Sequence, residues 1–492
     1  MSIDLSLDRL HTLVSHLPPY TRPTLHIAGT NGKGSVSAIL SSILLASTFK
    51  VGRYNSPHLV SIYDCITIDG APVPAELYHQ TRQIVEAKDK ELSLKSTNFE
   101  LLTVTALQVF EVLKVEVVVL EVGMGGRLDA TNIIPDDVVL ASALTAVDLD
   151  HQAFLGDTVE KIAKEKAGIA RRGKPFILGN QTHPSVDGVV QSVVQGAKAN
   201  LLYAPQVQRG NTTSSTDDTN EDGFSLLPFR KPAPQVVHIQ LSHLSAPLSL
   251  RLPLYGDHQL DNLGTALGVI DSLLDPSYRN PLQYKITISS ISSGVASVQW
   301  PGRLSFQEAQ IALEDNSTVN MNLLVDGAHN AASAKTLSAY ITHLLDQDAH
   351  HSPQGGPHTV NVTYILALSH SPPKLPIQTL SELLPIRLHP NSLTKINTSV
   401  ALPRFSKPDG MPWIKRVPAS ELKGIIHDLV PEAEVWTPKE SEQVEDDSTN
   451  LSDALQWVAS RLKADERNLV VLAGSLYLVA DLYRICGVNV ER

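Results

Sequence analysis

The segment TLHIAGTNGKGSVSAILSSILL, residues 24–45, decides the fold of this chain. Its mostly apolar start predicts a strand over 24–28. A glycine-rich turn with a single lysine follows, and small and apolar residues then predict a helix over 36–45. A strand, a tight turn and a helix in this order make the unit from which α/β folds with parallel sheets are built.

The turn has the residues of a phosphate-binding loop. Unpaired backbone N–H groups at the start of a helix attract phosphate, and the helix dipole acts in the same direction. Gly29, Gly32 and Gly34 let the backbone come close to an anion. Lys33 can reach the β- and γ-phosphates, and the Ser35 hydroxyl can face Mg²⁺. The turn therefore predicts a nucleoside-triphosphate site.

The spacing of this turn differs from the usual P-loop, which has four residues between its first glycine and the Gly-Lys pair. Here only Thr30 and Asn31 stand between them, and Gly34 precedes Ser35. A plain glycine turn between a strand and a helix is the alternative interpretation.

Strands and helices continue to alternate along the chain. In the first half we expect helices over 5–17, 104–113 and 157–170, and strands over 115–122 and 138–146. In the second half we expect strands over 322–325, 360–368 and 469–473, and a helix over 331–345. The pattern predicts an α/β protein with parallel sheets.

A chain of 492 residues exceeds one ordinary core, so we expect two domains. We place the boundary near Trp300 and Pro301, which gives domains over 1–299 and 300–492. The second is expected to be smaller and Rossmann-like, although it has no Gly-x-Gly-x-x-Gly dinucleotide motif. Three polar stretches interrupt the pattern: a disordered insertion over about 208–234, a loop over 346–358 and a stretch near 440–450.

Composition argues against several classes of function. The formal net charge is −11 and no basic run is present, so we expect no nucleic-acid partner. Long uncharged apolar stretches are missing, so no membrane span is expected. Two cysteines suit a reducing compartment. The N-terminus carries acids and has neither a signal-peptide core nor a clear transit helix, which favours the cytoplasm over the mitochondrion.

Two polar residues follow predicted strands, at the edge where α/β sheets bind ligands. Glu121 ends the 115–122 strand, and its carboxylate suits Mg²⁺, which takes hard oxygen ligands; a solvated glutamate is the alternative. His151 follows the 138–146 strand and is either a ligand or a hydrogen-bonded structural residue. For Lys166, in a predicted helix, the residues alone favour a surface ion pair.

Two motifs of the second half allow two interpretations each. Asp326 and Asn330, in DGAHN, lie at a strand-to-helix turn, and either could cap the following helix. Arg303, in WPGR, could clamp phosphates as the domains close, or simply tie the domains together.

Ten motifs resemble, in order, those of the folylpolyglutamate synthase/dihydrofolate synthase family, part of the Mur-ligase superfamily. They are GTNGKGS (29–35), SPHLVS (56–61), NFELLT (98–103), EVGMGGRLDATN (121–132), LDH (149–151) with LGDT (155–158), EKAGI (165–169), GDHQLDN (256–262), WPGR (300–303), DGAHN (326–330) and GSLYL (474–478). The resemblance implies a P-loop Mur-ligase-type central domain with a parallel sheet, a smaller C-terminal Rossmann-like domain, and ATP in the cleft between them.

The resemblance also implies roles for individual residues. The triphosphate-binding set matches Asn31, Gly32, Lys33, Gly34 and Ser35, and further nucleotide contacts match Asn262, Arg303 and Asp326, with His329 beside them. Metal ligands match Ser56, Glu121, His151 and Lys166, the last as a carbamylated lysine whose new carboxylate binds Mg²⁺. A pteroate pocket matches Ile3, Asp4, Leu5, Phe99, Leu128, Asp129 and Ala130. The expected catalytic residues are Lys33, Glu121, His151 and Lys166.

The reaction that the resemblance implies is ATP-dependent amide formation. A pterin-bearing carboxylate attacks the γ-phosphate to give an acyl phosphate, and the amine of glutamate then displaces phosphate. Two Mg²⁺ ions and Lys33 would neutralise charge on the transferring group, with a monovalent cation as a further candidate. The implied substrates are ATP, dihydropteroate and L-glutamate, and the implied state is a monomer.

Within the family, GMPWI (410–414) and GSLYL are similar to the fungal dihydrofolate synthases, which join the first glutamate to dihydropteroate. Polyglutamylating members usually carry Glu-Arg-Ile where this chain has Asp64, Cys65 and Ile66, and the missing arginine favours the same activity. The alternatives are a folylpolyglutamate synthase or bifunctional enzyme, a Mur-type ligase for another acid, a P-loop NTPase that makes no ligase product, and an inactive scaffold.

Overall fold

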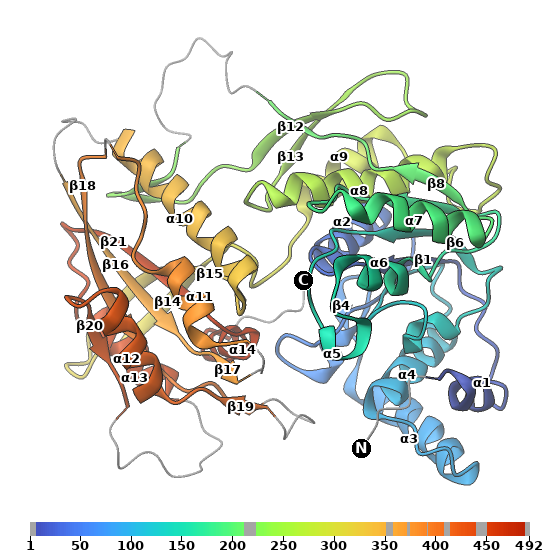
Figure 1. The fold of residues 1–492 in the computed structure, drawn as a ribbon, viewed down its shortest axis with the longest axis horizontal. Helices are drawn as coiled ribbons and strands as arrows, with labels where there is room; N and C mark the ends of the chain where they lie inside the picture. Colours follow the sequence, from blue (N-terminus) through green and yellow to red (C-terminus); the bar gives the residue numbers. More distant parts are fainter. Residues whose placement is uncertain are drawn as a thin grey trace.

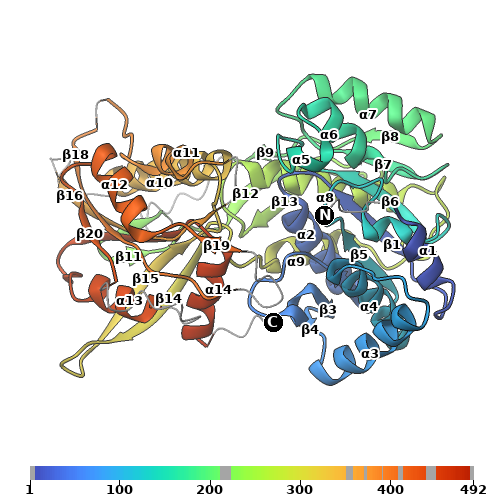
Figure 2. The same cartoon turned by 60° about the horizontal axis from the view of Figure 1, so that its bottom comes forward.

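A computed structural model describes residues 6–210, 223–350, 358–370, 374–390, 392–407, 414–438 and 450–487. They form two α/β units, each built around its own sheet, which lie side by side in Figures 1 and 2. The first sheet has eight strands and the second has six. The chain finally passes from the first unit to the second between α9 (Ile288–Ser297) and β14 (Ser305–Ala312).

The sheet of the first unit runs in the order β4-β3-β2-β5-β1-β6-β7-β8. Neighbouring strands from β2 to β8 are parallel, whereas β3 and β4 form an antiparallel edge. The strands are β1 (Thr24–Ala28), β2 (Val51–Tyr54), β3 (Ile66–Ile68), β4 (Ala71–Pro72), β5 (Val117–Glu121), β6 (Val139–Leu144), β7 (Pro175–Leu178) and β8 (Asn200–Tyr203). Every residue of β1 and β5 is buried, which explains their continuous apolar runs. The three strands predicted in this half are confirmed as β1, β5 and β6.

Helices cover both faces of this sheet (Figure 2). One face carries α2 (Lys33–Ala46), α8 (His258–Leu274) and α9. The other carries α1 (Asp8–Val14), α3 (Ala75–Glu91) and α4 (Asn98–Leu113), and beside β7 lie α5 (Gln152–Leu155), α6 (Val159–Ala167) and α7 (Ser185–Gly196). Two 3₁₀ turns, η1 (Ile62–Cys65) and η2 (Ala130–Ile133), complete the unit. The four helices predicted in this half are confirmed as α1, α2, α4 and α6, with shifted ends.

The prediction of a disordered insertion over 208–234 is wrong for the two parts of this range that the structure describes, because both contain strands. Residues 211–222, between these parts, lie outside the described residues. A small sheet of β9 (Gln208–Arg209), β12 (Gln235–Ile239) and β13 (Leu248–Leu252) packs on the first unit. Between β9 and β12, the hairpin of β10 (Ser225–Leu226) and β11 (Phe229–Arg230) packs on the second unit instead, where Phe224 is fully buried. Figure 1 shows β12 and β13 beside α8 and α9. Composition hid this, because a few apolar residues stand among many polar ones.

The sheet of the second unit runs β14-β15-β21-β16-β18-β20, with β14 and β15 antiparallel and the others parallel. Its strands after β14 are β15 (Thr318–Val325), β16 (His358–Leu366), β18 (Thr394–Ala401), β20 (Glu434–Trp436) and β21 (Arg467–Ala473). One face packs on α10 (Ala331–His350), α11 (Pro376–Leu383) and α12 (Ala419–Leu429), and the other on α13 (Leu451–Ala459) and α14 (Leu476–Ile485). A separate pair joins β17 (Ser369–His370) to β19 (Lys415–Arg416). The strands and helix predicted in this half are confirmed as β15, β16, β21 and α10.

The loop expected over 346–358 is wrong at its start, because α10 continues to His350. Asp348 in its last turn is completely buried, and its Oδ1 lies 2.6 Å from Nη1 of Arg467. A polar residue can lie inside a fold when its charge is paired, and composition does not reveal such a partner. Residues 351–357 and most of the stretch near 440–450 lie outside the described residues. Among the helices that the structure describes, none combines the length and apolar character needed to cross a membrane.

Candidate active site

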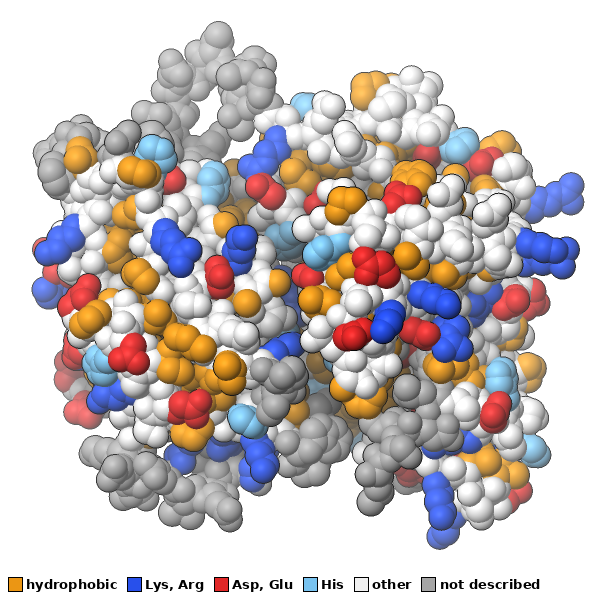
Figure 3. Space-filling model, in the orientation of Figure 1, with side chains coloured by type: hydrophobic (Ala, Val, Ile, Leu, Met, Phe, Trp, Pro, Cys, Tyr) orange, Lys and Arg blue, Asp and Glu red, His pale blue; other side chains and the backbone are white. Residues whose placement is uncertain are grey.

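A cavity of about 1570 Å³ lies between the two units. It is lined from the first unit by the loops that follow β1, β2, β5 and β6, and from the second by residues around 326–337 and 475–477. These loops lie at the carboxyl edge of the parallel strands, where open α/β sheets bind ligands. The space-filling view shows the boundary between the units as a furrow (Figure 3).

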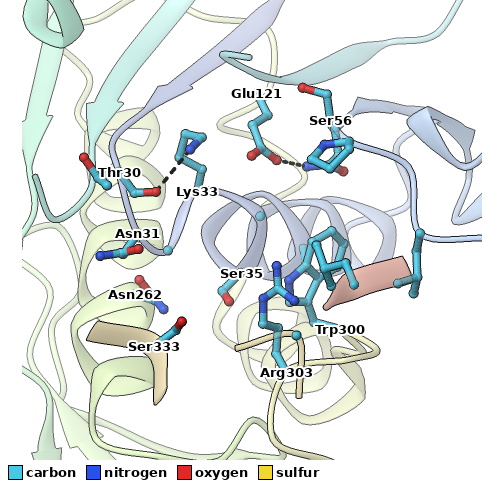
Figure 4. Close-up of a pocket in the computed structure, with 18 of the residues that line it drawn as sticks. Thr30, Asn31, Lys33, Ser35, Ser56, Glu121, Asn262, Trp300, Arg303 and Ser333 are labelled. Atoms are coloured by element: carbon cyan, nitrogen blue, oxygen red, sulfur yellow. Dashed lines mark hydrogen bonds between the residues drawn. The ribbon is translucent and has the colours of Figure 1, made fainter. Parts of the chain in front are cut away.

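The glycine-rich turn forms the floor of this cavity. Gly32 has φ 95°, and a Cβ built on it would lie 2.1 Å from Oδ1 of Asn262, so only glycine fits. α2 starts at the next residue, Lys33, whose Nζ donates to the carbonyls of Gly29 (3.1 Å) and Thr30 (3.2 Å). Figure 4 shows this lysine turned back over the loop. Asn262 reaches this turn from α8.

Glu121 ends β5 with its carboxylate in the cavity wall. The side chain is buried and accepts a hydrogen bond from Nδ2 of Asn55 (Figure 4). Burial raises the pKa of this carboxyl group, while Lys33, the Asn55 hydrogen bond and two arginines act in the opposite direction. Ser56 follows Asn55 in the chain and also lines the cavity. The asparagine directly before SPHLVS was the available signal for Asn55, and the sequence interpretation missed it.

Lys166 is not the surface residue that its helix suggested. It is 3% exposed, and its Nζ donates to the Gly29 carbonyl of the glycine-rich turn at 2.8 Å. Burial, reinforced by nearby Lys33, lowers its pKa to about 7. The surface ion pair belongs instead to the neighbouring Glu165, which contacts Arg127 at 3.1 Å. α6 therefore turns Lys166 inward, toward the turn that follows β1.

His151 begins the short helix α5 with φ 51° and its side chain is half-exposed. Its Nε2 lies 3.6 Å from Oδ2 of Asp150. The other Asp150 oxygen lies 3.2 Å from Nζ of Lys374, in the second unit. This ion pair joins the two units across the cavity mouth. No sequence motif pointed to Lys374.

The DGAHN turn of the second unit lines the same cavity as the glycine-rich turn of the first. Asp326 does not cap α10: its two carboxylate oxygens accept from the backbone N–H groups of Leu304 and Ala328, both at 2.8 Å. Asn330 is the cap, since its Oδ1 accepts from the N–H of Ser333 at 2.9 Å. His329 is exposed and its Nδ1 lies 3.0 Å from the Gly327 carbonyl oxygen.

Arg303 lies next to this turn, in the chain that connects the units. Its Nη1 donates to the Gly302 carbonyl at 2.9 Å. Burial raises the pKa of Asp326, and the positive charge of Arg303 opposes that shift. Arg303 lines the cavity together with Trp300, and Figure 4 shows the two side chains near each other.

The residues expected in a pteroate pocket are not all in this cavity. Phe99, Leu128, Asp129 and Ala130 do not line it, although the Phe99 ring lies against Gly123, which does. The Asp129 carboxylate holds its own loop by accepting from the N–H groups of Met124 (2.8 Å) and Thr131 (2.9 Å). The remaining three, Ile3, Asp4 and Leu5, lie outside the described residues. Cys65 is 1% exposed and faces the core rather than the cavity.

The donors around Glu121 fit a magnesium ion that keeps part of its water. One carboxylate and the hydroxyls of Ser35 and Ser56 line the same cavity, and these are hard oxygen donors. Within the described part of the chain no group of three or more His, Cys, Asp or Glu side chains could hold a metal by itself. A metal here would therefore need ligands of another kind, such as substrate phosphates.

Comparison with protein families gives a match to the C-terminal domain of dihydrofolate synthetase over residues 307–485. The chain is 35% identical to the dihydrofolate synthetase of Saccharomyces cerevisiae over 489 residues, which are 99% of this chain and 98% of that one. It is 30% identical to a probable dihydrofolate synthetase of Schizosaccharomyces pombe over the full length of both.

Solved structures show the same architecture. A Mycobacterium tuberculosis folylpolyglutamate synthase complexed with ADP matches with a TM-score of 0.70 at 26% identity, over 99% of this chain and 95% of that one. Escherichia coli FolC in complex with DHPP and ADP matches with a TM-score of 0.69 at 25% identity, over 99% and 94%. The two-unit α/β fold is thus shared with enzymes solved in complex with ADP.

Proposed function

Because the chain belongs to the folylpolyglutamate synthase/dihydrofolate synthase family, we propose that it joins L-glutamate to 7,8-dihydropteroate in an ATP-dependent reaction, giving 7,8-dihydrofolate, ADP and phosphate. One observation carries the proposal beyond family membership. Lys33 and Glu121, from two segments of the first unit, line one cavity with Arg303 from the connection between the units. Lys166 lies behind the glycine-rich turn, where its Nζ donates to the Gly29 carbonyl. The full-length similarity to two fungal dihydrofolate synthetases supports this activity over polyglutamylation.

We propose that the cavity holds ATP with its phosphates on the phosphate-binding turn. Asn31, Gly32, Lys33, Gly34 and Ser35 would surround the triphosphate, and Asn262, Arg303, Asp326 and His329 would complete the nucleotide site. Support comes from the N-terminus of α2, which lines the cavity and has no side-chain cap, since backbone N–H groups and the dipole at a helix start favour phosphate. Lys33 in this conformation donates only to backbone carbonyls, and a phosphate would be the stronger acceptor.

In the proposed first step the carboxylate of dihydropteroate attacks the γ-phosphorus, which forms an acyl phosphate and releases ADP. Lys33 and Arg303 would offset the charge that spreads over the transferring phosphoryl group. In the second step the amine of L-glutamate attacks the acyl carbon, and phosphate leaves as the amide forms. Phe99, whose ring lies against the cavity residue Gly123, is proposed to contact the pteroate together with Leu128, Asp129, Ala130, Ile3, Asp4 and Leu5.

We propose Ser56, Glu121, His151 and Lys166 as the residues that hold Mg²⁺, with two ions in the complete site and a monovalent cation as a further candidate. Bound Mg²⁺ would supply positive charge to the phosphates. Lys166 can take part only after carbamylation, in which its neutral amine adds to CO₂ and releases a proton. The pKa of about 7 supports this, because much of the amine is then neutral at physiological pH.

The proposed function is tested by product formation with Mg²⁺, ATP and radiolabelled L-glutamate. Dihydropteroate and a reduced folate monoglutamate are supplied in separate reactions, and a Lys33→Met variant serves as the inactive control. Label incorporated only with dihydropteroate is the expected result. Label incorporated with both acceptors would make the enzyme bifunctional. ATP hydrolysis without incorporation, or no reaction at all, would contradict the proposal and favour an NTPase or a scaffold.

We further propose that the protein works as a monomer in the cytoplasm. Sedimentation velocity of the purified protein and imaging of a fluorescent fusion test the two statements separately.

A further inference from the structure

Arg53 is a cavity residue that no motif singled out. It lies near the end of β2, one residue before Tyr54, and alternation along the strand turns the two side chains to opposite faces. Tyr54 packs among α3 and α4, so Arg53 lies on the face that carries α2. Its side chain lines the large cavity together with Glu121 and Trp300.

The guanidinium group of Arg53 has few interactions within the protein. Its Nε is buried and has no hydrogen-bond partner among the described residues. The contact that the structure does provide is stacking, with Cζ 5.2 Å from the centre of the Trp300 ring. Trp300 in turn lies on the start of α2, because a Cβ built on Gly34 would be 2.4 Å from its Cζ2. The stack therefore holds the arginine beside the phosphate-binding turn with its hydrogen-bonding capacity unused.

The charge around Arg53 is unbalanced in favour of cations. Glu121 is the carboxylate that interacts with it, and the same carboxylate also interacts with Lys33 and Arg303. Burial lowers the pKa of Arg53 to about 10, so the group still carries its charge at neutral pH. A partly enclosed cation without its own counter-ion is costly unless a ligand supplies the missing charge.

We propose that Arg53 binds a substrate oxyanion in the cavity, either the terminal phosphoryl group of the nucleotide or a carboxylate of the amino acid. A guanidinium group suits both, because its planar set of donors matches the oxygens of phosphate and carboxylate. Stacking on Trp300 fixes the plane of the group before the substrate arrives. The inference rests on the proposed function for the identity of the two substrates, but not for the presence of an anion site.

The test is calorimetry on the full-length protein and its Arg53→Met variant. Three ligands are titrated separately: ADP, a non-hydrolysable ATP analogue and L-glutamate. The glutamate titration uses protein that is already saturated with the ATP analogue. Loss of a charge-assisted contact should weaken one of these ligands by about 10- to 100-fold. Weaker binding of the ATP analogue with unchanged ADP binding identifies the terminal phosphoryl group. Weaker binding of glutamate alone identifies the amino-acid carboxylate.

Two further variants separate anion binding from packing. Arg53→Lys keeps the charge but loses the planar donors, so it should recover part of the lost affinity. Arg416 is the matched control, since its guanidinium stacks on Phe405 at 5.7 Å without lining the large cavity. Arg416→Met should leave all three affinities unchanged.

The inference is overturned if Arg53→Met lowers the thermal midpoint while every affinity stays within twofold of the wild type. That result would make Arg53 a packing partner of Trp300. Product formation by the wild-type enzyme is measured independently. If the wild type binds nucleotide through Arg53 but makes no dihydrofolate, the proposed function is contradicted, whereas the inference about Arg53 still holds.

Discussion

Gly32 shows how one position combines a backbone requirement with a packing requirement. Its φ of 95° belongs to the left-handed region, and the space where a Cβ would stand is taken by the Asn262 side chain. The residue therefore lets the start of α2 lie against Asn262 of α8. Any side chain here must move Asn262, deform the turn, or both.

We expect Gly32→Ala to weaken ADP binding by at least about tenfold, because about 1–3 kcal/mol of backbone strain is added to the clash with Asn262. Gly188→Ala, in α7, is the matched control: no atom lies within 4 Å of its built Cβ. That variant should leave binding unchanged and stabilise the helix by about 0.5–1 kcal/mol. Calorimetry and thermal unfolding measure both effects, and normal ADP affinity in Gly32→Ala would contradict the expectation.

Lys166 illustrates the limit of local pattern at the same scale. Two lysines and a glutamate stand close together on α6, and the sequence pattern placed Lys166 on the surface. The fold buries it instead, while Lys164 remains exposed. A helix turns residues two positions apart to nearly opposite sides, so the choice depends on which side packs against β1 and its turn.

At the scale of elements, β1 carries a buried titratable group in the middle of its apolar run. His26 is completely buried, and its Nε2 lies 2.9 Å from Oγ1 of Thr131. Burial holds the pKa of His26 well below its usual value, with the charge of Arg171 acting in the same direction. The folded strand therefore contains a neutral imidazole throughout the physiological range.

This histidine should make the protein less stable in mild acid. Below pH 6.5 the unfolded chain binds a proton at His26 that the folded chain does not, so the free energy of unfolding falls as the pH is lowered. The contribution is about 1.4 kcal/mol for each pH unit below 6.5. His26→Gln should remove that contribution, whereas His238→Gln, at an exposed position of β12, should not.

Urea unfolding of the three proteins at pH 5, 6 and 7 measures the effect. The difference between wild type and His26→Gln should change with pH in the stated direction. An unchanged difference between pH 7 and pH 5 would mean that His26 is protonated equally in both states.

α10 is anchored at its last turn by a buried ion pair. Asp348 accepts hydrogen bonds from the N–H of Leu226 (2.8 Å) and from Arg467 (2.6 Å), so one carboxylate connects the helix, the β10–β11 hairpin and β21. If the Asp348 carboxylate were removed, the Leu226 N–H and the Arg467 guanidinium would each lose a strong acceptor.

Asp348→Ala should lower the free energy of unfolding by about 3–5 kcal/mol, because Arg467 is left as a nearly buried, unpaired charge. Adding Arg467→Met should recover part of that loss. Asp157→Ala, which breaks the exposed pair with Lys161, is the control and should cause no measurable change. Equal losses for the single and double variants would show that the charge of Arg467 does not carry the penalty.

At the scale of the whole molecule, the β10–β11 hairpin complicates the division of the chain near residue 300. It comes from the first half but packs on the second unit, where the rings of Phe224 and Phe306 lie 6.0 Å apart. The same insertion returns through β12 and β13 to the core of the first unit. The units are therefore joined by this segment as well as by the connection around Trp300.

We expect a fragment of residues 300–492 to expose an apolar face and to bind a hydrophobic dye, because it lacks the hairpin. Fusing residues 223–232 to its start through a flexible Gly/Ser linker should suppress dye binding, and the same fusion with Phe224→Ser should not. A monomeric, dye-free fragment of residues 300–492 alone would show that the boundary at 300 is sufficient. Gel filtration and dye fluorescence measure these outcomes.

Much of the fold followed from local pattern. The strand predicted over 24–28 has these bounds in β1. The helix predicted over 36–45 is α2, which starts at Lys33 and ends at Ala46, and the remaining predicted strands and helices occur with shifted ends. Mostly apolar runs mark strands buried on both faces, because both sets of alternating side chains are then removed from water. Segments of mixed composition were the failures: the residues flanking 211–222 and the end of α10 carry few apolar side chains, and these are buried by distant partners.

The sequence by itself determined the α/β class and the family, because these depend on residues that are close together in the chain. The tertiary structure alone decided that Lys166 is buried against the Gly29 carbonyl, that Asn330 rather than Asp326 caps α10, and that Arg53 stacks on Trp300 beside the turn. Each of these contacts joins segments that the chain order separates or that a helix could present to either side. Burial and electrostatic environment arise from such packing, and they set the chemistry available in the cavity.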